Sequence, residues 1–121
     1  MESRPTTVWI VNEAGHDYDR AKEIAGENAK FSSLTEDDIN PHQVDRLSKH
    51  IAKGIINYAD IEDYVLVSGT PMVNVLAIHI WLIHFGKCKV LQWDAKHRCY
   101  RVTVLEDDAT RNMMQKVLER G

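Results

Sequence analysis

The pattern of apolar and polar positions is most distinctive in a strand, a turn and a helix near the middle of the chain. Tyr64 to Val67 is aliphatic and β-branched without polar alternation, which is typical of a strand covered on both faces. Ser68 to Pro71 breaks this strand, and we expect Thr70 to cap the next helix with Pro71 as its first residue. Val73 to Phe85 is then apolar on almost every side. The pattern predicts a central strand that leads through a tight turn into a largely buried helix.

The flanking segments predict four more strands and three more helices. We expect strands at residues 7–11, 30–34, 87–93 and 98–105, and a short helix at residues 18–25 that stops at Gly26. A second helix is expected to begin at Asn40-Pro41 and to run past Ile56 on an amphipathic spacing. Acidic residues at 106–108 introduce the last helix, which continues through Arg120. Its predicted buried stripe consists of Met113, Met114, Val117 and Leu118.

The order of these elements, β-α-β-α-β-α-β-β-α, predicts a single α/β domain over residues 1–121. Alternating strands and helices favour a three-layer arrangement around a mainly parallel five-stranded sheet, with an antiparallel last strand. We expect a flavodoxin-like or Rossmann-like strand order of 2-1-3-4-5. In that order the connections after strands one and three leave toward opposite faces, which opens a crevice at their carboxyl ends.

Composition and charge narrow the class of protein. The 121 residues are 44% hydrophobic and carry a formal net charge of −3, with basic residues scattered along the chain. This distribution argues against a nucleic-acid partner. The N-terminal residues lack the apolar core of a signal peptide, and the apolar helix is shorter than the roughly twenty residues that span a bilayer. We therefore expect a cytoplasmic protein without a membrane contact.

The two cysteines, Cys88 and Cys99, fall in the predicted hairpin. With residues 94–97 as its turn, Trp93 would face Arg98 and Cys88 would face Thr103. This register separates the two thiols, so we expect no disulfide. No Cys or His residues have the spacing of a zinc site, and neither a metal nor another cofactor is expected.

The predicted crevice brings together the loops after strands one and three. The start of the apolar helix offers backbone N–H groups and the hydroxyls of Ser68 and Thr70, which suit a phosphate or carboxylate. An ordinary strand-to-helix turn is the alternative interpretation, since the chain has neither a P-loop nor a GxGxxG motif. The candidate ligand-binding residues are Asn12, Gly15, His16, Ser68, Gly69, Thr70, Asn74 and Trp93.

His16 is also a candidate catalytic residue, because histidine exchanges protons near neutral pH. Asp17 and Glu13 are the carboxylates that would act beside it as acid or base. Solvent-exposed loop residues are the alternative interpretation, and no motif of a known catalytic class accompanies them.

The apolar helix has no polar face, which is unusual at the surface of a small monomer. We expect its outer face, with Ile80, Trp81 and His84, to pack against another subunit or under the last helix. The sequence therefore predicts a homo-oligomer.

Two segments, VWIVNEAGHDYDRA and VLVSGTPMVNVLAIHIWLIHFGKCKVLQWDA, resemble small phage-encoded α/β proteins. The resemblance implies an accessory or counter-defence factor, and it carries over no catalytic residues. The leading hypothesis is a protein that binds a phosphate-bearing, nucleotide-like ligand. The alternatives are a hydrolase or transferase acting on a nucleotide or nucleoside, and a structural or protein-interaction oligomer.

Overall fold

A computed structural model describes residues 4–35 and 43–120. Its strands are β1 (Thr7–Asn12), β2 (Lys30–Thr35), β3 (Tyr64–Leu66), β4 (Lys87–Asp94) and β5 (Cys99–Glu106). Its helices are the 3₁₀ turn η1 (Asp19–Ala21), α1 (Lys22–Ala25), α2 (Val44–Tyr58), α3 (Pro71–Phe85) and α4 (Asp107–Glu119). The expected cap at Asn40-Pro41 lies outside the described residues, and α2 is described from Val44 onward.

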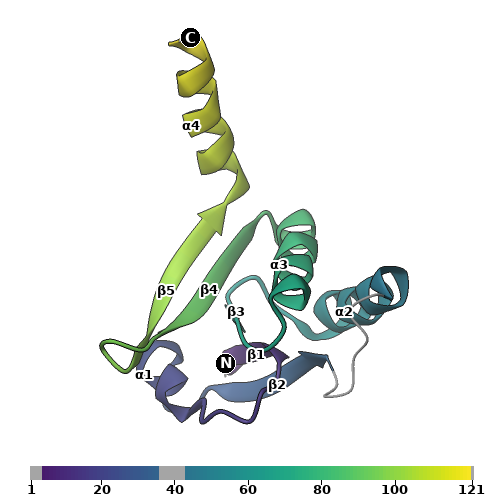
Figure 1. The fold of residues 1–121 in the computed structure, drawn as a ribbon, viewed down its shortest axis with the longest axis vertical. Helices are drawn as coiled ribbons and strands as arrows, with labels where there is room; N and C mark the ends of the chain where they lie inside the picture. The colour runs from purple at the N-terminus through teal and green to yellow at the C-terminus, as the bar shows by residue number, and fades with distance from the viewer. Residues whose placement is uncertain (1–3, 36–42, 121) are drawn as a thin grey trace.

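The five strands form one sheet in the order β2-β1-β3-β4-β5 (Figure 1). All neighbouring strands are parallel except β4 and β5, which pair antiparallel. The α/β class, the strand order and the antiparallel last strand are thus confirmed. All six residues of β1 are buried, as expected for a strand with a neighbour on each side and helices over both faces.

Side chains of β1 alternate between two hydrophobic cores. Trp9 and Val11 point to the face that α2 and α3 cover, where they join Ile51, Ile55 and Trp81. Val8 and Ile10 point to the opposite face, which η1 and α1 cover with Tyr18 and Ala21. The second cover is thin because the expected helix at 18–25 is divided into a 3₁₀ turn and a four-residue α1.

Local signals set both ends of α3. Thr70 is the N-cap in an extended conformation and Pro71 is the first helical residue, as the sequence predicts. The helix ends at Gly86, whose φ of 77° lies in the left-handed region that glycine tolerates best. Trp81, however, is fully buried in the core, so the expectation that it lies on an outer face is wrong. The rotation of α3 turns this indole toward the sheet.

The β4–β5 hairpin has a register that differs by two residues from the predicted one. Trp93 pairs with Tyr100 and Cys88 with Leu105, because the turn consists of residues 95–98. The carboxylate of Asp94 fixes this turn by accepting hydrogen bonds from the backbone N–H groups of Lys96 and His97. A slip of two residues leaves every side chain on its predicted face. Both cysteines are free thiols.

The last helix, α4, does not pack on the sheet. It projects from the end of β5 away from the rest of the domain (Figure 1), and none of its residues is buried. The predicted buried stripe is therefore wrong for the chain on its own. Among the described residues, no helix is long and apolar enough to cross a membrane.

Candidate functional site

The loops after β1 and β3 meet at the carboxyl edge of the sheet, as expected from the prediction that these two strands are neighbours. Gly69 has a φ of +78°, and a Cβ built on it would lie 2.8 Å from Cβ of Asn12. The hydroxyls of Tyr18 and Ser68 share a hydrogen bond of 2.8 Å, and Tyr18 also accepts one from the Ala14 N–H. The two loops are thus in direct contact.

A second set of hydrogen bonds joins the turn before α3 to the first turn of that helix. Asn74 accepts a hydrogen bond from the Ser68 N–H and donates to the carbonyl oxygens of Ser68 and Thr70. Asn12 and Asn74 are both buried, whereas Gly15, His16 and Gly69 are exposed. The backbone groups of Ser68 and Thr70 thus satisfy the buried amide of Asn74.

The three candidate catalytic side chains point to different partners. Asp17 accepts a hydrogen bond from the Asp19 N–H at the start of η1, and Glu13 accepts one from the Ser33 hydroxyl at 3.5 Å. The ring of His16 stands edge-on to Tyr18, with 6.2 Å between centroids. Among the described residues, no hydrogen bond joins His16 to either carboxylate. Their catalytic role stays a prediction.

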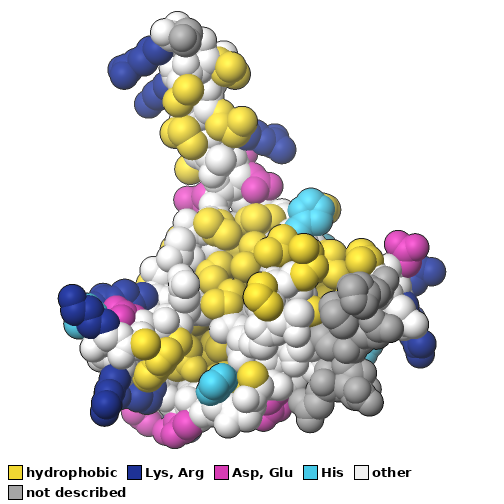
Figure 2. All heavy atoms as spheres, viewed as in Figure 1, with side chains coloured by type: hydrophobic (Ala, Val, Ile, Leu, Met, Phe, Trp, Pro, Cys, Tyr) yellow, Lys and Arg dark blue, Asp and Glu magenta, His cyan; other side chains and the backbone are white. Residues whose placement is uncertain are grey.

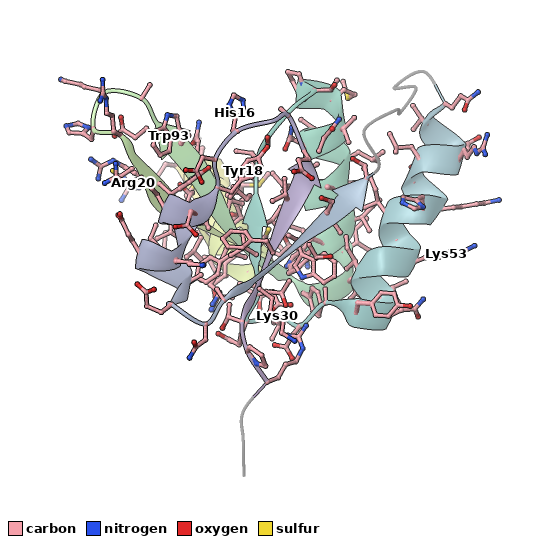
Figure 3. The ribbon with its side chains drawn as sticks, turned by 90° about the horizontal axis from the view of Figure 1, so that it is seen from below. His16, Tyr18, Arg20, Lys30, Lys53 and Trp93 are labelled. Atoms are coloured by element: carbon pink, nitrogen blue, oxygen red, sulfur yellow. The ribbon has the colours of Figure 1, made fainter. Side chains whose placement is uncertain are left out.

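Charge at this edge is unfavourable for an anion. Glu13, Asp17 and Asp19 all line a hollow of about 430 Å³ beside β2. Trp93, the predicted ligand wall, stacks edge-on against Tyr100 with 5.0 Å between centroids. In Figure 3, His16, Tyr18 and Trp93 lie toward one edge of the molecule, whereas Lys53 is carried by α2 on the other side.

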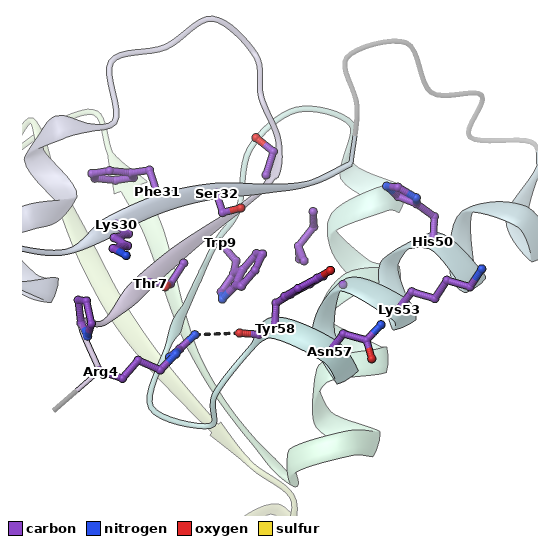
Figure 4. A pocket seen from close by; sticks show the side chains of 14 residues that line it. Arg4, Thr7, Trp9, Lys30, Phe31, Ser32, His50, Lys53, Asn57 and Tyr58 are labelled. Atoms are coloured by element: carbon purple, nitrogen blue, oxygen red, sulfur yellow. Dashed lines mark hydrogen bonds between the residues drawn. The ribbon is translucent and has the colours of Figure 1, made fainter. Parts of the chain in front are cut away.

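A larger hollow of about 840 Å³ lies between β2 and α2. Two small residues, Ser32 and Gly54, are among those that line it, and a Cβ built on Gly54 would lie 3.8 Å from Leu34 Cδ2. Trp9 and Tyr58 lie between the strand and the helix (Figure 4). Tyr58 is 70% exposed, so its ring is accessible for stacking on a ligand.

The charge of this hollow is opposite to that of the whole chain. Arg4, Lys30, His50 and Lys53 line it, and none of the described Asp or Glu residues does, although the chain carries a net charge of −3. Among the described residues, neither Lys30 nor Lys53 forms a salt bridge, whereas Arg4 is paired with Asp63. Lys53 extends along α2 at the margin of the hollow (Figure 4).

Asp63 holds the floor of the hollow in place. Its carboxylate accepts hydrogen bonds from both terminal nitrogens of Arg4, from Trp9 Nε1 at 3.0 Å, and from backbone N–H groups of Thr7 and Asp60. Burial raises the pKa of this carboxyl, but the hydrogen bonds from Arg4, Thr7, Trp9 and Asp60 outweigh burial and lower it below its ordinary value. Asp63 is therefore ionised at neutral pH and keeps Trp9 oriented.

Sequence reasoning missed this hollow. His50, Lys53 and Asn57 recur at helical spacing on α2, which is a recognisable signal for one face of a helix. That face of α2 lines the hollow only because β2, which carries Lys30, lies beside it. No local sequence pattern indicates that β2 and α2 are neighbours.

Comparison with known families adds one result. A family model for phage Pam3 gp32-like proteins matches residues 6–106. The chain belongs to this family. The span matched by the phage Pam3 gp32-like family includes all five strands and α2 and α3, and it ends at the last residue of β5. No curated protein and no solved structure matched the sequence.

Proposed function

We propose that this phage Pam3 gp32-like protein binds a small molecule that carries a phosphate on a flat ring, such as a nucleotide. The observation that supports this proposal is the hollow between β2 and α2, which the described part of this acidic chain lines with basic side chains and without a carboxylate. Its volume of about 840 Å³ is in the range of small-molecule sites, about 300–1,000 Å³.

Two groups of the hollow have separate roles in this proposal. The exposed ring of Tyr58 stacks on the flat part of the ligand, as aromatic side chains do with bases. Lys30 and His50 contact the phosphate, which gains from charge-assisted hydrogen bonds. The ligand class is the one that the sequence predicts, whereas its location moves from the carboxyl edge to the side of β2.

Isothermal titration calorimetry with nucleoside mono-, di- and triphosphates and the matching nucleosides tests this proposal. We expect binding of a phosphorylated member and at least tenfold weaker binding of its nucleoside, because a charged contact contributes about 1.5–3 kcal/mol. Lys30→Glu and Tyr58→Ala should each weaken binding by at least about tenfold. Lys49→Glu, on α2 but outside the lining, is the matched control and should bind as the unmodified chain does.

Two outcomes would contradict the proposal. One is that no member of the panel binds. The other is that His16→Ala or Thr70→Asp abolishes binding while Lys30→Glu does not, which would move the ligand back to the carboxyl edge.

A further inference from the structure

Helix α4 carries an apolar stripe that none of the described residues covers. Met113, Met114, Val117 and Leu118 recur at helical spacing, and 53–72% of each side chain is exposed. Helices shorter than about 12–15 residues are only marginally stable in water without packing. A 13-residue helix with its apolar face in solvent therefore requires a partner surface.

Helix α3 offers a second uncovered apolar surface on the same side of the molecule. Met72, Val75 and Ile83 are 60%, 60% and 72% exposed, and Pro71–Phe85 contains no Asp, Glu, Lys or Arg. Figure 2 shows hydrophobic side chains along α4 and again below it, over the part of the domain where α3 lies in Figure 1. An apolar surface of this extent is typical of a protein–protein contact.

Within the described ranges 4–35 and 43–120, the chain does not cover these surfaces itself. β5 ends at Glu106 and α4 begins at Asp107, so no loop allows the helix to turn back over the domain. The Asp107 N–H also donates to the Gly86 carbonyl oxygen at 3.0 Å, which joins the start of α4 to the end of α3. Beyond this junction α3 and α4 extend in different directions (Figure 1).

We propose that the partner is a second copy of this chain, with α4 of each copy packed against α3 of the other. Three properties of the two surfaces favour this occupant over an unrelated protein. The helices have 15 and 13 residues, or about 22 and 20 Å, so they match in length. The exposed face of α3 carries no Asp, Glu, Lys or Arg, so no such charged group of α3 loses its water in the contact. The two surfaces meet at one junction near Gly86. A two-fold axis there would cover α3 and α4 of both copies and would leave no apolar helix face for a third copy.

The proposal also fixes the direction of the pairing. Because α3 runs toward the junction and α4 runs away from it, α4 and the partner's α3 are antiparallel. Ile83 then lies opposite the first turns of α4, and Val75 lies opposite its last turns near Leu118. Seven large apolar side chains, each more than half exposed in one copy, form the centre of the contact. They are Met72, Val75, Ile83, Met113, Met114, Val117 and Leu118.

Sedimentation velocity of the full chain over a range of concentrations tests the assembly. We expect a dimer of the 13.9 kDa chain, and at least about 100-fold weaker dimerisation for Leu118→Asp and for Val75→Asp, since each buries an unpaired charge in the contact. Asn112→Asp, on the opposite face of α4, is the matched control and should dimerise normally. Circular dichroism should show folded monomers for both interface variants, because both positions are exposed within one chain.

Disulfide cross-linking tests the reciprocal pairing of α3 with α4. In a Cys99→Ser background, a mixture of Val75→Cys and Leu118→Cys chains should form a covalent dimer on oxidation, while each variant alone should not. Cross-linking of Leu118→Cys alone would show α4 packing on α4 and would overturn the pairing. An unmodified chain that stays monomeric at all concentrations, or a dimer that tolerates both Asp substitutions, would overturn the proposal as a whole.

Discussion

At the scale of single residues, Asp63 connects parts of the chain that are far apart in sequence. Its five hydrogen bonds reach the N-terminal segment, β1 and the loop before β3. Its side chain is 1% exposed. Burying a carboxylate is costly, and the hydrogen bonds from these donors offset that cost. The donors in turn depend on Asp63 as their acceptor.

Replacement of Asp63 should therefore be strongly destabilising. Asp63→Ala leaves the Arg4 charge and the Trp9 and Thr7 N–H groups without their acceptor, and we expect a loss of about 3–5 kcal/mol in the free energy of unfolding. Urea unfolding at pH 7 measures this difference, with the exposed Asp45→Ala as control, expected within about 0.5 kcal/mol of the unmodified chain.

The pH dependence of the free energy of unfolding, measured for the unmodified chain and for Asp63→Ala, shows whether the loss comes from the ionised carboxylate. The pKa of Asp63 is lower in the folded chain than in the unfolded one, so its stabilisation is present above the unfolded pKa of about 3.9 and is lost as pH falls through the folded pKa. The difference between the unmodified chain and Asp63→Ala should shrink below about pH 4. A difference that stays constant down to pH 2 would show that the loss is one of packing alone.

At the scale of elements, Gly69 shows that the turn before α3 depends on its contact with β1. Two causes act together at this position, a positive φ and an approach of 2.8 Å between a built Cβ and Asn12. Gly15 has a similar φ of +74° but no atom within 4 Å of a built Cβ. The two glycines thus separate backbone strain from steric contact.

Gly69→Ala should cost clearly more stability than Gly15→Ala. We expect about 1 kcal/mol for the backbone strain at Gly15, and a further 1–3 kcal/mol or so at Gly69 for the forced displacement of Asn12. Thermal or urea unfolding of both variants measures the difference. Equal losses at the two positions would mean that the β1 and β3 loops move apart freely.

Elements were predictable from sequence where short-range signals fix them. Thr70, Pro71 and Gly86 mark the ends of α3 locally, and the alternation of strands and helices indicates the sheet order. The hairpin register depended on a side chain, Asp94, that organises its own turn. Trp81 was misplaced because an apolar helix without a polar face carries no periodic signal for its rotation. The hollow beside β2 was missed because Lys30 and His50 approach only through folding.

At the scale of the whole molecule, assembly and stability should be linked. If a second copy covers α3 and α4, the folded state is favoured by mass action, and the melting temperature rises with protein concentration. We expect this rise for the unmodified chain and for Asn112→Asp, and none for Leu118→Asp. Differential scanning calorimetry at several concentrations measures it, and a melting temperature independent of concentration in every variant would contradict the link.

The place of β1 in the sheet also determines how the chain is exposed during synthesis. β1 precedes β3 by more than fifty residues, yet it lies between β2 and β3. At about 5–20 residues per second, β1 waits on the order of several seconds for its second neighbour and for Asp63. During this interval a strand that is apolar on both faces has an open edge. We therefore expect the nascent chain to expose an extended apolar segment that is buried in the finished domain.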